Sequence, residues 1–183
     1  SLGVLLIFIL NKNISYDYSL LTILIMILII NFPFNLFGKN FLGDSGSYLV
    51  AFMTGYVLVD FYISYSEISA LFIVTLLWYP AFENLFSIIR KKINKIDPSK
   101  PDSNHFHQLI FKFFMLKFKD KKKTNIISSL IINLFNLIVF FLAYYLYNSS
   151  IGLTVLLLIN TILYTYCYLF LLKKIKNFKQ KIN

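Results

Sequence analysis

The chain has 183 residues, of which 58% are hydrophobic and only 14% are charged. Soluble domains are about 45–50% apolar and about 25% charged, so composition excludes an ordinary soluble fold. The formal net charge of +10 would fit nucleic-acid binding, but the basic residues lie between and after apolar segments. That is where they anchor a protein to anionic lipid, so we expect a membrane protein with no nucleic-acid partner.

Apolar segments follow one another along the chain, and their lengths predict membrane-spanning helices. The first apolar run is too short for a crossing, which needs about 20 residues, so we interpret residues 1–10 as the end of a helix from a longer protein. Helices satisfy their own backbone hydrogen bonds in lipid, and the sequence lacks the short alternating strands of a β-barrel. The prediction is one all-α domain over residues 1–183, a polytopic transmembrane helix bundle. Its spans are expected at about residues 20–34, 47–63, 68–89, 125–147 and 151–172.

The distribution of Lys and Arg predicts the orientation of these spans. Most basic residues lie in a loop at residues 90–124 and in a tail at residues 173–183, whereas the connections at 64–67 and 148–150 have none. Basic loops stay on the cytoplasmic side of a membrane. The loop, the tail and, by alternation, the connection at residues 31–46 are therefore predicted to be cytoplasmic.

The basic loop is expected to contain a short helix of its own. A turn is predicted at residues 97–101, where two prolines exclude a helix. Beyond it, apolar residues recur at helical spacing beside lysines, which predicts an amphipathic helix. Such a helix could lie in the cytoplasmic interface or pack on the bundle, and the sequence favours neither. The apolar positions are Phe106, Leu109, Ile110, Phe113 and Phe114.

A first polar cluster lies at residues 41–47, at the beginning of a predicted span. Gly43, Asp44 and Ser47 combine a permissive backbone, a carboxylate and a hydroxyl there. Backbone N–H groups at a helix N-terminus suit phosphate, and Asp44 could hold Mg²⁺, which prefers oxygen ligands and bridges to substrate phosphates. The alternative is a plain turn in which Asp44 caps the helix.

A second polar cluster, at residues 101–108, contains both histidines of the chain, His105 and His107, after Asp102. Neutral imidazoles could bind a metal, and protonated ones could hold phosphate oxygens. The alternative is a pair of solvated loop histidines. Glu83, near the cytoplasmic end of the third predicted span, is a further candidate because an acid within a span is costly; the alternative is that it reaches interfacial water.

Taken together, these clusters resemble one family, the polyprenyl-phosphate N-acetylhexosamine-1-phosphate transferases of glycosyltransferase family 4. Residues 31–34 and 38–47 resemble its Asn-x-Pro…Phe-x-Gly-Asp-x-Gly-Ser signature. Residues 78–90 are similar to its helix leading into the last large cytoplasmic loop, and residues 101–109 resemble its His-x-His-His loop. Order and spacing of the separate blocks agree over residues 31–110, which is more specific than any one block.

This chain departs from the family pattern at several positions. Gln108 replaces the final histidine of the loop, and residues 35–37 look like a short insertion. The family's Asp-Asp pair on an earlier cytoplasmic loop is not in this chain. Because the resemblance assigns that pair to metal and polyprenyl-phosphate handling, we expect this portion of the protein to be inactive alone.

The resemblance implies a reaction: transfer of a sugar 1-phosphate from a UDP-N-acetylhexosamine to polyprenyl (undecaprenyl) phosphate, with release of UMP, which begins synthesis of a cell-envelope polysaccharide such as lipopolysaccharide. It implies Asp44 as the catalytic metal ligand, for Mg²⁺ or alternatively Mn²⁺. It also implies a bacterial cytoplasmic membrane, membrane lipid around the helices, and active-site loops and C-terminus in the cytoplasm, and it allows a homodimer. The implied substrate-binding residues are Asn31, Gly43, Ser47, Asp102, His105 and His107.

Two other functions are compatible with repeated membrane crossings. A non-catalytic multi-pass protein, such as a transporter or an assembly subunit, usually places its polar groups near mid-bilayer. An inactive remnant of a transferase is the other alternative. Here the polar clusters lie at the predicted cytoplasmic ends, which favours an enzyme that acts on one soluble and one lipid substrate.

The predicted topology places Asp44 and Lys122 on the same side of the membrane, the cytoplasmic side. The variants Asp44→Cys and Lys122→Cys should both be modified by a membrane-impermeant thiol reagent from the cytoplasmic side, because both lie in segments that the charge distribution assigns to it. Labelling of intact and of lysed cells measures this. Modification of the two positions from opposite sides would show that the topology is wrong.

Overall fold

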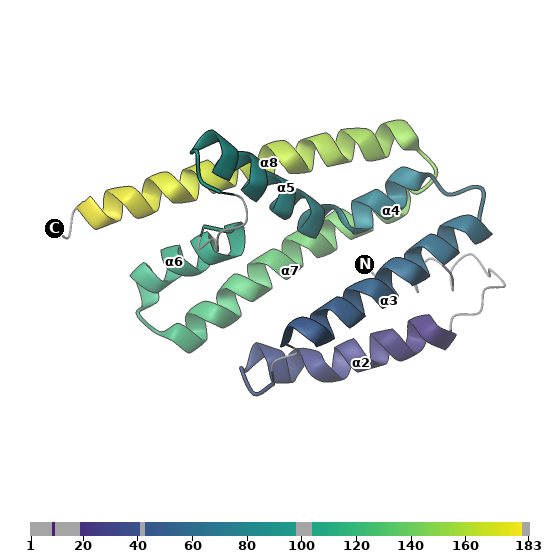
Figure 1. The fold of residues 1–183 in the computed structure, drawn as a ribbon, viewed down its shortest axis with the longest axis horizontal. Coiled ribbons are helices and arrows are strands. Elements are labelled where there is room, and N and C mark those ends of the chain that lie inside the picture. The colour runs from purple at the N-terminus through teal and green to yellow at the C-terminus, as the bar shows by residue number, and fades with distance from the viewer. Residues whose placement is uncertain (1–8, 10–18, 41–42, 98–103, 181–183) are drawn as a thin grey trace. The chain divides into compact units, whose positions relative to one another are not determined.

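The computed structural model describes residues 9, 19–40, 43–97 and 104–180 (Figure 1). Over these residues the chain forms seven helices and no strand. The predicted helix at residues 1–10, apart from Ile9, and the predicted turn, apart from Asp97, lie outside them. The helices are α2 (Ser19–Leu36), α3 (Gly43–Ser64), α4 (Ala70–Leu76), α5 (Trp78–Ile93), α6 (Phe106–Phe118), α7 (Lys121–Tyr145) and α8 (Ser150–Gln180).

Three of these helices, α3, α7 and α8, are long and apolar enough to cross a membrane. No more than 22% of the apolar stretch of each is buried within the structure, so most of their apolar side chains face outward, as expected for helices dissolved in lipid. Helices α4 and α5 would make a fourth span if they cross together, and α2 is apolar but shorter. The predicted all-α membrane bundle is thus confirmed.

Contacts within the chain define two compact units. The first comprises Ser1–Leu76 and Leu137–Thr154, and the second comprises Leu77–Asn136 and Val155–Asn183. A single membrane domain over the whole chain stays a prediction.

The first unit contains α2 and α3, which contact one another, and the short α4, which contacts α3. The connection before α4 is tied to the turn between α7 and α8: the Ser69 N–H donates to the Tyr147 carbonyl at 3.0 Å, and the hydroxyls of Ser69 and Ser150 lie 2.9 Å apart. These bonds satisfy polar groups where the helices end. The buried side chains of this unit include Val57, Leu58, Phe61 and Phe72.

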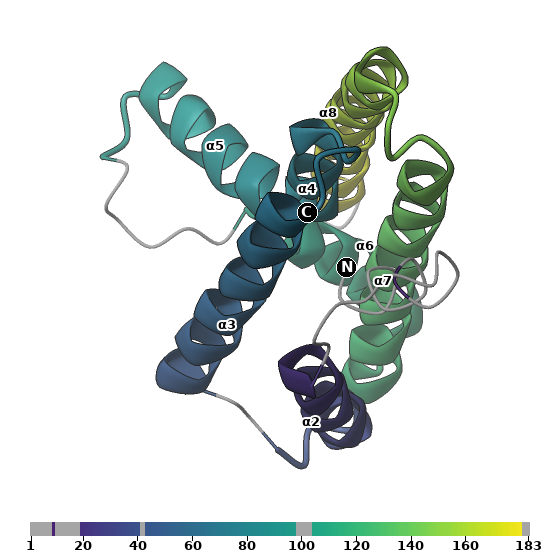
Figure 2. The same ribbon diagram turned by 90° about the vertical axis from the view of Figure 1, so that its right-hand side faces the viewer.

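The second unit contains α5, α6, the first part of α7 and most of α8. Helix α6 lies beside the beginning of α7 and beside α8 (Figures 1 and 2). The Thr124 hydroxyl of α7 is 3.9 Å from the Met115 sulfur of α6, and the rings of Phe106 and Tyr164 are 4.7 Å apart. The predicted amphipathic helix is therefore confirmed, and its buried Leu109 shows that it packs on the other helices.

The predicted span at residues 68–89 is wrong as a single helix, because the chain is broken at Leu77 between α4 and α5. Proline lacks an N–H, and its ring collides with the carbonyl four residues earlier, here that of Leu76. Pro80 consequently lies in the first turn of α5, where proline is tolerated. The Ala81 N–H closes that turn on the Leu77 carbonyl at 3.4 Å.

Pro33 does not end the first predicted span, because α2 continues to Leu36 with Pro33 inside it. The proline removes one backbone hydrogen bond near the end of the helix, a loss that membrane helices tolerate. Just beyond the helix, Gly38 has a φ of +67°, which allows a Schellman motif. In this motif the Lys39 N–H donates to the Phe34 carbonyl at 2.8 Å. Residues 35 and 36 are helical, so part of the expected insertion at residues 35–37 belongs to this end of the helix.

The helices extend further into the basic segments than predicted. Helix α8 continues to Gln180, so most of the predicted tail at residues 173–183 is helical, and α7 already begins at Lys121, inside the predicted loop at residues 90–124. Lysine is a good helix former, and residues 121–124 and 173–180 contain neither Gly nor Pro. The change from apolar to basic residues therefore does not mark a helix end.

Helix α5 ends in the same motif as α2, but with a lysine in place of the glycine. Lys95 has a φ of +55°, its N–H donates to the Lys92 carbonyl at 3.1 Å, and the Ile96 N–H donates to the Lys91 carbonyl at 2.8 Å. The left-handed conformation is unfavourable for a residue with a Cβ.

Substitutions at these two helix ends should change the free energy of unfolding in opposite directions. Lys95→Gly is expected to raise the free energy of unfolding by about 0.5–1 kcal/mol, and Gly38→Ala to lower it by about 1 kcal/mol, because only glycine adopts positive φ without steric cost. No atom lies within 4 Å of a Cβ added at Gly38, so its effect should be one of backbone strain alone. Denaturation in detergent measures both, and equal signs would contradict the assignment.

Candidate functional site

The candidate site of the second unit is built on one polar face of α5. Glu83, Ser87 and Arg90 are spaced so that successive turns of the helix place them on the same side. Tyr164 and Tyr168, four residues apart on α8, face this stripe, and both are almost fully buried. The hydroxyl-bearing face of α8 thus meets the charged face of α5.

The Glu83 carboxylate accepts hydrogen bonds from three directions. Its Oε1 accepts from the Phe106 N–H at 2.7 Å and lies 3.1 Å from Nδ1 of His105. Its Oε2 accepts from the Tyr164 hydroxyl at 2.9 Å. The side chain is only 9% exposed, so it does not reach interfacial water, and its cost of burial is offset by these bonds.

Aromatic rings surround the bond between Glu83 and Tyr164. The ring of Tyr164 lies 5.1 Å from that of Phe82, 5.3 Å from that of Phe86 and 4.7 Å from that of Phe106. Such surroundings exclude water and lower the local dielectric, which strengthens hydrogen bonds within them. The carboxylate is therefore held in a fixed position.

A second set of contacts holds the residue before His105. Arg90 and the Tyr168 hydroxyl both donate to the Asn104 carbonyl, the latter at 2.9 Å, and Arg90 also donates to Tyr168. The Arg90 guanidinium lies over the Tyr168 ring, 5.5 Å from its centroid. On the other side, the Lys112 ammonium donates to the Asn104 side chain at 3.1 Å. The backbone on both sides of His105 is thus anchored to α5 and α8.

The histidines lie at the N-terminus of α6. His105 is its N-cap residue, and the Gln108 side chain accepts from the His105 N–H at 3.2 Å in a capping box. The rings of His105 and His107 are nearly parallel, with centroids 5.6 Å apart. Although His107 is exposed, partial burial of its ring lowers its pKa from the ordinary value; His105 adds to this shift and Glu83 opposes it. The lowered pKa favours the neutral form of the His107 ring.

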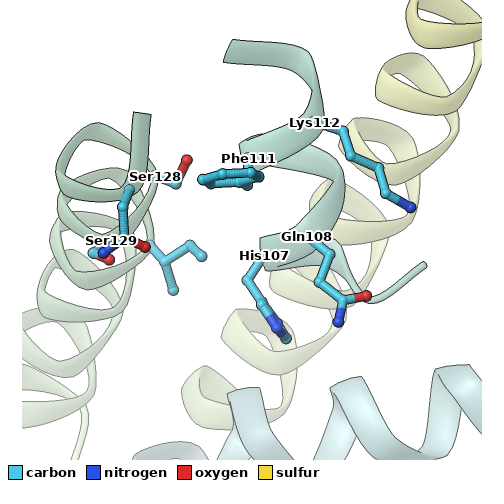
Figure 3. Close-up of a pocket in the computed structure, with 8 residues that line it drawn as sticks. His107, Gln108, Phe111, Lys112, Ser128 and Ser129 are labelled. Atoms are coloured by element: carbon cyan, nitrogen blue, oxygen red, sulfur yellow. The ribbon is translucent and has the colours of Figure 1, made fainter. Parts of the chain in front are cut away.

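A cavity of about 400 Å³ lies between α6 and the beginning of α7 (Figure 3). Phe111 reaches from α6 toward Ser128 of α7, and Lys112 points away from α7. The lining is mainly apolar, with an imidazole, amides and hydroxyls at a few points, which is typical of a small-molecule cavity. The lining residues are His107, Gln108, Phe111, Lys112, Asn125, Ser128, Ser129 and Ile132.

The remaining predicted residues that the structure describes belong to the first unit. Asp44 is exposed in the first turn of α3, one residue after the helix begins, so it is not the N-cap of the alternative interpretation. Gly43 has a φ of +67°, and the Ser47 hydroxyl donates to its carbonyl at 2.7 Å. The Asn31 side chain accepts from that of Asn40 at 3.0 Å and donates to the Ile27 carbonyl.

The two predicted clusters differ in how much of them the structure brings together. His105 and His107 stand together in the second unit, and Asp102 lies outside the described residues. In the described ranges no three His, Cys, Asp or Glu side chains gather as a metal site. The sequence indicates Glu83 as a candidate but not its partners. The spacing of Glu83, Ser87 and Arg90 within an apolar helix could have indicated a polar face on this helix.

Comparison with known proteins gives one partial similarity. No family model matches the chain, and no solved structure matches it. The chain is similar to a protein of Bacillus subtilis (strain 168) described as a probable undecaprenyl-phosphate N-acetylglucosaminyl 1-phosphate transferase, with 33% identity over 76 residues. The aligned segment is 41% of this chain and spans only 21% of that relative. This chain is thus a helical membrane protein with partial similarity to a transferase.

The anchoring of Asn104 can be tested at Tyr168. Tyr168→Phe should lower the free energy of unfolding by about 1 kcal/mol and speed amide exchange at the beginning of α6, because it removes one hydroxyl donor from the Asn104 carbonyl. Hydrogen exchange and denaturation in detergent measure these effects. The matched control is Tyr166→Phe on the exposed side of the same helix, and equal effects of both variants would refute the anchoring.

Proposed function

We propose that the chain is part of a membrane transferase that moves a sugar 1-phosphate from a UDP-N-acetylhexosamine to polyprenyl phosphate and releases UMP. The observation that carries the proposal is the histidine pair, which is fixed at the N-terminus of α6 beside a cavity that combines a mainly apolar lining with a few polar groups. The similarity to the Bacillus subtilis protein supports the same class of reaction.

The second unit supplies groups that suit a nucleotide diphosphate sugar. His107, Gln108 and Ser129 offer nitrogen, amide and hydroxyl groups around a cavity large enough for a sugar ring. In this proposal the histidines contact the diphosphate or the sugar and orient the donor.

Asp44 in the first unit suits the proposed metal. Mg²⁺ in phosphoryl transfer is commonly held by one or two carboxylates together with substrate phosphates and water, and one exposed carboxylate beside Gly43 fits that pattern. When bound, Mg²⁺ or Mn²⁺ would neutralise the diphosphate charge that develops as UMP leaves. Asn31 and Ser47 would bind the substrate near it.

The proposed reaction balances without a further reactant. An oxygen of the polyprenyl phosphate forms a bond to the β-phosphorus of the UDP-sugar, and the bond from that phosphorus to the bridging oxygen breaks. UMP leaves with the electron pair of that bond, and the lipid carries a sugar diphosphate. The lipid product remains in the membrane, where it would begin a cell-envelope polysaccharide.

The distribution of charge supports a cytoplasmic site. Helix α5 ends in Arg90, Lys91 and Lys92, and α7 begins with three exposed lysines in the same unit as α6. Basic residues attract anionic lipid and nucleotide, and they stay on the cytoplasmic side. We therefore infer a bacterial cytoplasmic membrane with the histidine loop and the C-terminus in the cytoplasm, and a homodimer is compatible with it.

The metal role is tested by Asp44→Asn in the full-length protein. Transfer should fall by about 100-fold or more, because the amide lacks the charge that holds Mg²⁺, while membrane insertion stays normal. UMP release from UDP-N-acetylglucosamine in the presence of undecaprenyl phosphate measures this. Asp60→Asn, near the other end of α3, is the matched control and should retain activity. Near-normal transfer by Asp44→Asn would refute the role.

A further inference from the structure

Glu83 holds two consecutive residues of the histidine loop through a single oxygen. Its Oε1 lies 2.7 Å from the Phe106 nitrogen and 3.1 Å from the His105 ring. We propose that Glu83 is a positioning residue, which sets the orientation and the tautomer of the His105 ring for the reaction. This inference rests on the proposed function.

One atom fixes both the backbone and the ring of the loop. The bond to the Phe106 N–H fixes the position of the loop backbone relative to α5, and the contact with Nδ1 fixes the rotation of the His105 imidazole ring. A ring that donates from Nδ1 keeps its lone pair on Nε2, so the carboxylate also selects the tautomer. The atom that His105 would present to a substrate is thereby chosen by a residue of another helix.

The carboxylate itself cannot turn to follow the loop. Its Oε2 is bonded to the Tyr164 hydroxyl at 2.9 Å, and Tyr164 is only 2% exposed. One residue before His105, Arg90 and Tyr168 hold the Asn104 carbonyl. The ring is therefore positioned by side chains that are themselves fixed by packing, as a preorganised site requires.

The capping box of α6 is formed by His105 and Gln108: the Gln108 side chain accepts from the His105 N–H at 3.2 Å, and the His105 ring faces the Gln108 backbone N–H. Glu83 is not a member of this capping box. The N–H of Phe106 would be satisfied by one oxygen of any polar side chain at position 83. What a carboxylate adds is an acceptor for Nδ1 in addition to that bond.

The test is Glu83→Gln in the full-length protein, with the chain's other glutamate as the matched control. The amide keeps the shape and one acceptor oxygen, so the helices should stay folded, with a thermal midpoint near that of the wild type. We expect kcat for UMP release to fall about 10- to 100-fold, as for other residues that orient a reacting imidazole. Glu67→Gln, in an exposed connection, should leave kcat unchanged.

The second readout is the tautomer of the His105 ring, which can be measured whether or not the protein is active. In ¹⁵N-histidine NMR, the His105 signal is identified as the one that is lost in His105→Gln. In the wild type this signal should be that of a ring protonated at Nδ1. In Glu83→Gln it should shift toward that of a ring protonated at Nε2. Tyr164→Phe, which frees the carboxylate without removing it, should give a smaller shift and a smaller loss of kcat.

Two results would overturn the positioning role. One is a wild-type His105 ring protonated at Nε2, and the other is a Glu83→Gln protein with wild-type kcat and tautomer. A wild-type protein that releases no UMP, yet shows the expected tautomer and its shift in Glu83→Gln, would overturn the proposed function and support the contact between Glu83 and His105.

Discussion

A buried carboxylate in the midst of aromatic rings is the constraint on which the second unit depends. Without donors, Glu83 would be strongly destabilising between apolar helices, because desolvation penalises its charge. Three donors come from three different places: the backbone of α6, the imidazole of its N-cap residue, and a hydroxyl of α8. Satisfying one acid thus ties three helices together at the end where the basic residues lie.

The same arrangement explains how a membrane bundle could carry a precise site outside the lipid. Loops are mobile unless something rigid holds them. Here the short helix α6 contacts α7 through Met115 and α8 through Phe106, and residues 104–106 are bonded to side chains that project from α5 and α8. Spanning helices provide the rigidity, while the histidines stay within reach of water. A water-soluble donor and a lipid acceptor need such a boundary position.

Much of the fold could be predicted from the sequence, because lipid imposes few solutions. Long apolar runs must be helical, and the basic loop, its amphipathic helix and both polar clusters followed from composition and spacing. The break at Leu77 could not be predicted, because a membrane helix can contain a proline such as Pro80. The helical tail could not be predicted either, because the apolar run ends before its lysines. The partners of Glu83 could not be predicted, since Tyr164 lies 81 residues away in the chain, within another predicted span.

The proposed transfer of a sugar phosphate to lipid is tested most directly by following the β-phosphate of the UDP-sugar. Membranes with the full-length protein would receive UDP-N-acetylglucosamine labelled at the β-phosphate, undecaprenyl phosphate and Mg²⁺. The proposed reaction places the label in the lipid fraction and releases uridine as UMP, with both dependent on the added lipid. Release of UDP, with the label absent from the lipid, would contradict sugar-phosphate transfer.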